Sequence, residues 1–146
     1  MKHECKPLDE KKYGQLTDFI SELFTVIRPA MYLQEWNFTL KFVEQDESDT
    51  IAGTNQCCGT YMQAILTFNV TLLQKFYDDK YGRDIALIVA HELAHCLTQP
   101  MFDYWDPVVS EREKELLRTM NETLTQRIAN CVMYGLDATP KVYKIK

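Results

Sequence analysis

The stretch DIALIVAHELAHCLT, residues 84–98, is the most regular segment of the chain. Ile, Leu, Val and Ala fill positions all around its helical projection, so the stretch predicts a helix that is buried on every side. Gly82 interrupts the regular secondary structure just before it, and Asp84 has a side chain that suits a helix N-cap. We expect this helix to lie at the centre of the fold.

Three polar residues interrupt this aliphatic helix: His91, Glu92 and His95. Residues four apart share one helical face, so the two imidazoles can bind a single zinc ion. Glu92 lies one step around the helix, where its carboxylate can take a proton from a water on that metal. Without such a partner, burying these groups would cost free energy. The pattern predicts one Zn²⁺ per chain, with Glu92 as the catalytic base.

A third protein ligand is needed, because zinc in a hydrolytic site has three protein ligands and one position open to water. The remaining histidine, His3, lies in a charged N-terminal arm, so we expect a carboxylate. Residues 108–134 predict a long helix with an apolar stripe formed by Leu116, Met120, Leu124, Ile128 and Val132. Three glutamates lie on roughly the opposite side: Glu111, Glu115 and Glu122.

Glu122 is the predicted third ligand. Ala129 and Met133 continue its side of the helix, which indicates that this end is covered and that the carboxylate is shielded from water. The two glutamates nearer the start of the helix have charged neighbours, as on a solvated face. The alternatives left open are these two and two aspartates that precede the helix: Glu111, Glu115, Asp103 and Asp106.

The rest of the chain predicts a mixture of helices and strands. An amphipathic helix is expected at 8–27 and a short one at 70–81. Alternating apolar and polar residues predict strands at 36–43 and 61–68, whereas the polar segment 44–59 predicts a loop or a wide hairpin connection. The predicted class is α+β, with a small antiparallel or mixed sheet.

The composition is typical of one globular domain spanning residues 1–146, of which 1–7 are expected to form a flexible arm. Apolar residues make up 46% of the chain and charged residues 25%, which excludes wholesale disorder. The net charge is −5 and the basic residues do not cluster. We therefore expect neither nucleic acid nor an anionic membrane as a partner.

A cytoplasmic location is expected. Residues 1–12 are charged and lack the apolar centre of a signal peptide. The longest apolar run, residues 85–90, is far shorter than the roughly 20 residues that a membrane span needs. The five cysteines have no metal-binding or redox spacing, which predicts mostly buried thiols in a reducing compartment.

The HELAH element on a buried helix, preceded by a helix and two strands and followed by a helix that bears a glutamate, resembles the zincin metallopeptidases. The gluzincin branch and the small zincin-like proteins of phages and bacteria are most similar. The resemblance covers residues 36–133 and implies a minimal zincin-like fold that hydrolyses peptide bonds in a peptide or protein substrate. It assigns His91 and His95 as zinc ligands, Glu92 as general base and Glu122 as third ligand.

The resemblance also implies roles for neighbouring segments. The strand at 61–68 would be an edge strand that accepts an extended peptide. The residue that stabilises the oxyanion is expected among three tyrosines: Tyr61, Tyr104 and Tyr134. A loop is expected after the metal helix, and its aromatic residues are candidates to line a substrate pocket: Phe102, Tyr104 and Trp105.

Gln126 departs from the family pattern, because many gluzincins have an aspartate four residues after the glutamate ligand. That change leaves the orientation of a metal-bound histidine without its usual partner. The alternative function is a zincin-like protein-binding module with a structural or vestigial zinc site, which the intact Glu92 disfavours. A regulatory protein associated with nucleic acid is a further class, and the net charge disfavours it.

Overall fold

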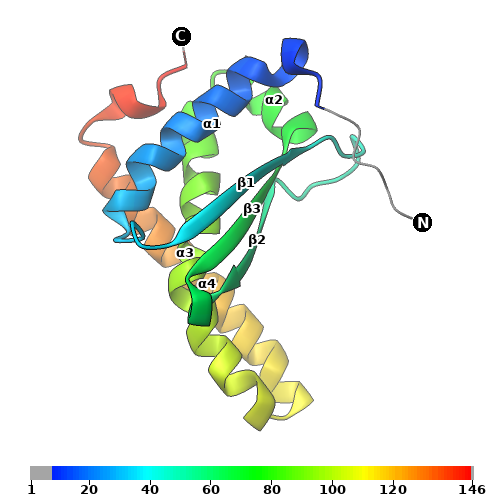
Figure 1. The fold of residues 1–146 in the computed structure, drawn as a ribbon, viewed down its shortest axis with the longest axis vertical. Helices are drawn as coiled ribbons and strands as arrows, with labels where there is room; N and C mark the ends of the chain where they lie inside the picture. Colours follow the sequence, from blue (N-terminus) through cyan, green and yellow to red (C-terminus); the bar gives the residue numbers. More distant parts are fainter. Residues whose placement is uncertain (1–7, 146) are drawn as a thin grey trace.

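The computed structural model describes residues 8–145, whose arrangement is shown in Figure 1. The helices are α1 (Glu10–Ala30), α2 (Val70–Asp78), α3 (Gly82–Trp105) and α4 (Glu111–Leu136). The strands are β1 (Asn37–Val43), β2 (Gly53–Cys58) and β3 (Gln63–Asn69), and three short 3-10 turns are η1 (Gly59–Tyr61), η2 (Asp106–Val108) and η3 (Pro140–Tyr143). The described residues therefore form an α+β fold, as predicted.

The sheet is mixed and has the strand order β1-β3-β2. β1 and β3 are parallel, whereas β2 and β3 are antiparallel. The alternation predicted for β3 is confirmed, since Ala64, Leu66 and Phe68 are buried on one face. Helices α1 and α3 cover that face, and Phe24 of α1 meets Phe38 of β1 edge to face with ring centroids 5.1 Å apart.

Helix α3 is the central helix, as predicted, but it is longer than expected at both ends. It begins at Gly82, where the carbonyl of Tyr143 occupies the space that any side chain would need. Asp84 therefore lies in the first turn and is not the N-cap. The helix continues through Pro100 because α4 packs alongside it, so the predicted loop with Phe102, Tyr104 and Trp105 is helical.

Strand β2 was not predicted, because residues 44–59 were expected to form a loop. Its inward-facing residues are Gly53, Asn55 and Cys57, which lack the large apolar side chains of an ordinary half-buried strand. They are small because the strand lies directly against α3. The expectation that 61–68 is an edge strand is also wrong, since β3 has neighbours on both sides and β2 is the edge strand next to α3.

Helix α4 confirms the predicted helix at 108–134 but not its predicted buried face. The expected apolar stripe is largely exposed, with Leu116, Met120 and Leu124 all open to solvent. The residues that α4 buries are Asn121, Thr125, Ala129 and Met133. The interface with α3 is therefore partly polar, and hydrogen bonds replace the apolar contacts that helical periodicity normally detects.

The expectation of mostly buried thiols is wrong for the part of the chain that the structure describes. Only Cys96 is buried, Cys57 is half-buried, and Cys58 and Cys131 are exposed because they lie on outward faces of β2 and α4. Cys5, His3 and the predicted flexible arm at 1–7 lie outside the described residues. Within residues 8–145, no helix combines the length and apolar character required to cross a membrane.

Candidate metal centre

The structure brings together the three predicted ligands, His91, His95 and Glu122. Nε2 of His91 is 3.3 Å from one Glu122 carboxylate oxygen, and Nε2 of His95 is 3.7 Å from the other. The three potential ligand atoms lie within 4.8 Å of one another. Ligands about 2 Å from a tetrahedral zinc ion stand roughly 3.3 Å apart, so the cluster has nearly the size of a zinc site.

His95 is held in a form that suits a metal. Burial lowers the pKa of His95, and the neighbouring His91 adds to this, although the Glu122 charge opposes it. A lowered pKa keeps the imidazole neutral, which is the form that binds metal ions. The two rings lie 4.9 Å apart and nearly perpendicular, with both Nε2 atoms directed toward Glu122.

Gln126 supplies the second partner of His91, at the position where the family pattern has an aspartate. Its Oε1 is 3.0 Å from Nδ1 of His91, and its Nε2 donates a 3.0 Å hydrogen bond to Oδ1 of Asn130. The bond to Asn130 keeps the amide oxygen toward the imidazole. Nδ1 of His91 then carries the proton and Nε2 keeps its lone pair for a metal. The structure thus explains the orientation that the sequence left open.

Glu92 is buried beside this cluster, with only 6% of its surface exposed. Burial raises the pKa of Glu92 to about 7, and the charge of Glu122 contributes in the same direction. Among the described residues, none donates a hydrogen bond to its carboxylate. A carboxyl group with a pKa near neutrality can both accept and return a proton, which is the property of a general base.

Glu122 occupies the predicted place but not the predicted environment. Its side chain is 61% exposed, whereas those of His91 and His95 are 21% and 15% exposed. Ala129 and Met133 are buried as expected, but they lie two and three turns further along α4 and do not cover the carboxylate. The expectation that Glu122 is shielded from water is therefore wrong.

The alternative ligands are not brought to the cluster. Asp103 accepts a hydrogen bond from Gln99, and Glu111 and Asp106 lie 2.8 and 3.9 Å from the Lys114 ammonium. Glu115 is exposed, and within residues 8–145 the only group of potential ligands close enough to hold a metal is the one that contains Glu122.

The edge strand β2 is fastened to α3 directly beside the cluster. Nδ2 of Asn55 donates to the Glu92 carbonyl at 2.5 Å and to Sγ of Cys96 at 3.3 Å. The thiol of Cys57 lies 3.8 Å from the His95 carbonyl oxygen. These contacts reach three successive polar positions of the HELAHC segment. These contacts hold α3 in one position along β2.

Gly53 allows the closest approach between the strand and the helix. A Cβ atom at this position would lie 2.9 Å from Cγ and 3.0 Å from Oε1 of Glu92. Any larger residue would displace the Glu92 side chain. The small residue at position 53 is therefore part of what places the carboxylate.

We expect Gly53→Ala to lower the free energy of unfolding by about 1–3 kcal/mol, because it overpacks the contact with Glu92. Thermal or urea unfolding measures this change. The matched control is Gly14→Ala in α1, where a Cβ would meet nothing within 4 Å and the change should stabilise by about 0.5–1 kcal/mol. When Glu92 is already alanine, Gly53→Ala should no longer lower the free energy of unfolding. If it still does, the contact with Glu92 is not the cause of the destabilisation.

Three adjoining cavities make a groove along the cluster. The middle one, of about 320 Å³, is lined by β2 residues, both histidines, Glu92, Gln99 and Glu122. A cavity of about 270 Å³ shares Gly53, His91 and Glu92 with it and adds the apolar side chains of Ala52, Leu87 and Ile88. A third, of about 360 Å³, shares Gln99 and Glu122 and lies between the connected ends of α3 and α4.

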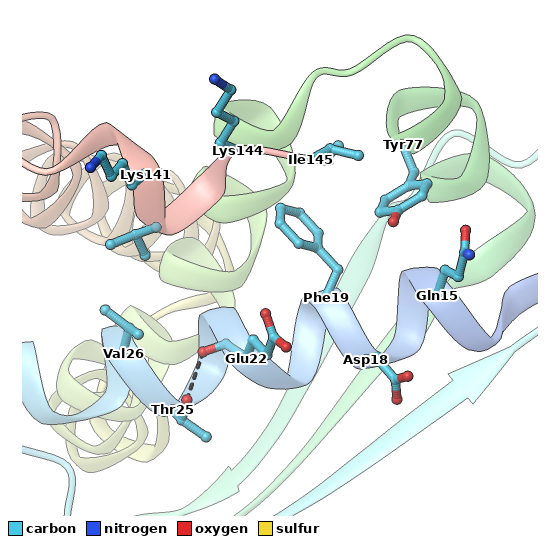
Figure 2. Close-up of a pocket in the computed structure, with 11 residues that line it drawn as sticks. Gln15, Asp18, Phe19, Glu22, Thr25, Val26, Tyr77, Lys141, Lys144 and Ile145 are labelled. Carbon is cyan, nitrogen blue, oxygen red and sulfur yellow. Dashed lines mark hydrogen bonds between the residues drawn. The ribbon is translucent and has the colours of Figure 1, made fainter.

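A larger cavity lies elsewhere in the described residues. It has a volume of about 680 Å³ and is bounded by α1, Tyr77 of α2 and the C-terminal segment. Figure 2 shows Phe19 extending from α1 toward that segment, whereas Asp18 points away. None of the residues that line it is a histidine or a cysteine. The smaller groove carries the chemistry because its polar groups converge on one point.

The three candidate tyrosines do not line this groove. Tyr61, Tyr104 and Tyr134 are 71%, 77% and 83% exposed, and none borders the cavity that contains the cluster. Gln99, which sequence reasoning did not single out, does border it. Asn121 in α4 was also missed, although it stands four residues before Thr125 and eight before Ala129. That spacing of small and polar residues is the signal that could have revealed the α4 face in contact with α3.

Comparisons with known proteins give no match. No protein-family model matches the chain, and neither a curated protein nor a solved structure is significantly similar to it.

Proposed function

We propose that the protein is a zinc-dependent peptidase of the zincin type, with His91, His95 and Glu122 as ligands and Glu92 as general base. The observation that carries this proposal is the convergence of two imidazoles and a carboxylate on one point beside a buried, otherwise unpaired glutamate. A purely structural zinc site has no use for that second carboxylate. The resemblance of the HELAH element to zincins supports the same reading.

Zinc bound at this cluster would supply a Lewis acid that acidifies water to a pKa of about 7 and polarises a carbonyl group. Glu92 takes one proton from the attacking water, whose oxygen forms a bond to the carbonyl carbon. Glu92 then returns that proton to the leaving nitrogen as the C–N bond breaks. One water is consumed, and the products are a carboxylic acid and an amine.

The edge strand β2 offers a place for the substrate backbone. It pairs with β3 on one side only, and Gly53, Thr54, Asn55 and Cys57 line the cavity that holds the cluster. An extended peptide can add to such an edge through backbone hydrogen bonds. In this proposal β2 takes the role that the resemblance had suggested for residues 61–68.

Zinc-loaded protein is expected to cleave peptides in a mixture of unstructured sequences, with the products identified by mass spectrometry. Chelation should abolish cleavage and added zinc should restore it. Zinc binding with no cleavage of any peptide would reject the peptidase and favour a protein-binding module with a structural ion.

Glu122→Ala should weaken zinc binding about tenfold or more, because it removes one of three ligands. The fold should be retained, since the side chain is largely exposed. Competition with a chromophoric chelator measures the affinity. Glu115→Ala is the matched control, an exposed glutamate two turns earlier on the same helix, and should leave the affinity unchanged. Equal affinities of the Glu122 variant and the parent would exclude Glu122 as a ligand.

A further inference from the structure

The groove contains few side-chain donors that are free to meet a substrate. Asn55 uses its amide group for the Glu92 carbonyl and the Cys96 sulfur. Cys57 points its thiol at the His95 carbonyl. Gln99 donates one N–H of its side-chain amide to Oδ1 of Asp103 at 2.7 Å. An amide NH₂ group carries two donors, so Gln99 keeps a second N–H uncommitted.

Gln99 lies on the same face of α3 as the proposed ligands, one turn after His95. It borders both the cavity that holds the cluster and the adjoining cavity between α3 and α4, and it shares both cavities with Glu122. Gln99 thus lies where the cavity of the cluster meets the cavity between the connected ends of α3 and α4.

A chain of hydrogen bonds holds the Gln99 amide in one orientation. Its Oε1 accepts a 2.7 Å bond from Nδ2 of Asn121, a buried residue of α4. Oδ1 of Asn121 accepts from Thr125, whose hydroxyl is 2.8 Å from that of Thr98. Asn121 holds the amide oxygen and Asp103 holds one N–H, so the amide is fixed in a side chain that lines the cavity with the cluster. A buried network of this kind between two helices presents a donor with little loss of conformational freedom.

We propose that Gln99 is a catalytic residue, whose free amide N–H donates a hydrogen bond to the oxyanion that forms as the substrate carbonyl is attacked. This inference rests on the proposed peptidase function and assigns the role that the exposed tyrosines do not fill. A fixed dipole aimed at the developing charge stabilises the transition state more than the ground state, so it raises the rate with little effect on substrate affinity.

Acetohydroxamate provides a test that needs no turnover, because its oxygens bind a metal where the oxyanion would lie. It is titrated into the Co²⁺-loaded protein and followed by the visible absorption of Co²⁺. Gln99→Glu keeps an oxygen for Asn121 but removes both N–H donors, and it should lower hydroxamate affinity roughly tenfold or more. Gln99→Leu should do the same. The metal affinity of each variant is measured alongside, so that loss of the ion is not mistaken for loss of the donor.

The matched control is Gln74→Leu in α2, which removes the same kind of Gln–Asp bond, at 2.8 Å and four residues apart, outside the groove. Its hydroxamate affinity should equal that of the parent. Arg118→Met tests a rival donor, since Arg118 lines the adjoining cavity. A loss in the Arg118 variant with none in the Gln99 variants would overturn the assignment.

With a cleavable peptide, both Gln99 variants should lose on the order of 10²-fold in kcat while KM stays within a few-fold. A change in KM alone would contradict an oxyanion role. If no peptide is cleaved but hydroxamate binding falls only in the Gln99 variants, the donor assignment stands and the peptidase function fails. If hydroxamate binding is unchanged while peptides are cleaved, the peptidase stands and Gln99 is excluded.

Discussion

Zinc content should fall to background when both His91 and His95 are replaced by alanine. These residues supply two of the three ligand atoms in the cluster, and Glu122 alone is an exposed carboxylate. Mass spectrometry of the purified protein after buffer exchange measures the metal content. The parent should hold one zinc per chain.

The control for this experiment addresses adventitious zinc. Cys58 and Cys131 are exposed free thiols, and thiolate is a ligand that zinc favours. A Cys58→Ser, Cys131→Ser variant should keep its one zinc. Stoichiometric zinc in the double histidine variant, combined with its loss in the serine variant, would place the ion outside the predicted cluster.

Glu92→Gln should retain zinc and lose peptide cleavage by a factor of at least about 10², the usual size of a general-base contribution. Glutamine has nearly the shape of glutamate but cannot accept the proton of the attacking water. Rates with the best substrate from the peptide mixture and zinc content on the same sample measure the two effects. A variant that cleaves at the rate of the parent would remove Glu92 from the mechanism.

The same variant makes a separate prediction about stability. The pKa of Glu92 is raised to about 7 in the folded protein, above its ordinary value of 4.5, so the folded state holds this proton more tightly than the unfolded state. The contribution of Glu92 to metal-free stability therefore becomes less favourable as the pH rises from about 4.5 to 7. After chelation, Glu92→Gln should be more stable than the parent at pH 8, by up to about 3 kcal/mol, and no more stable near pH 4.

The sequence alone was sufficient to predict α3 and the two histidines that it brings to the cluster. A long aliphatic helix interrupted by His91, Glu92 and His95 combines two signals, continuous burial and four-residue spacing, that depend on local geometry. The position of Glu122 was also predictable, because it follows from the same helical geometry in α4. The exposure of Glu122 was not predictable, because it depends on whether residues from other elements reach this part of α4.

The groove around the ligands was not predictable, for a physical reason shared by β2 and α4. Both meet α3 through small or polar side chains: Gly53 and Asn55 from the strand, Asn121 and Thr125 from the helix. Patterns of apolar residues identify surfaces that are buried by the hydrophobic effect. Surfaces held by close approach and by directional hydrogen bonds have no such pattern. The sequence therefore predicted a loop in place of β2 and assigned the wrong buried face to α4.

Helix α4 is packed against the core along its second half only, so metal binding at Glu122 would be coupled to local unfolding of its first half. The buried residues of α4 begin at Asn121, and residues 111–120 include none. The first turns of α4 can therefore open without disturbing the core, and their amide hydrogens should exchange with solvent sooner than those around Ala129. Glu122 stands at the boundary between the loosely held and the firmly held parts. An ion that joins Glu122 to α3 would move this boundary toward the start of the helix, so that the ordering of one helix end would become part of the binding equilibrium.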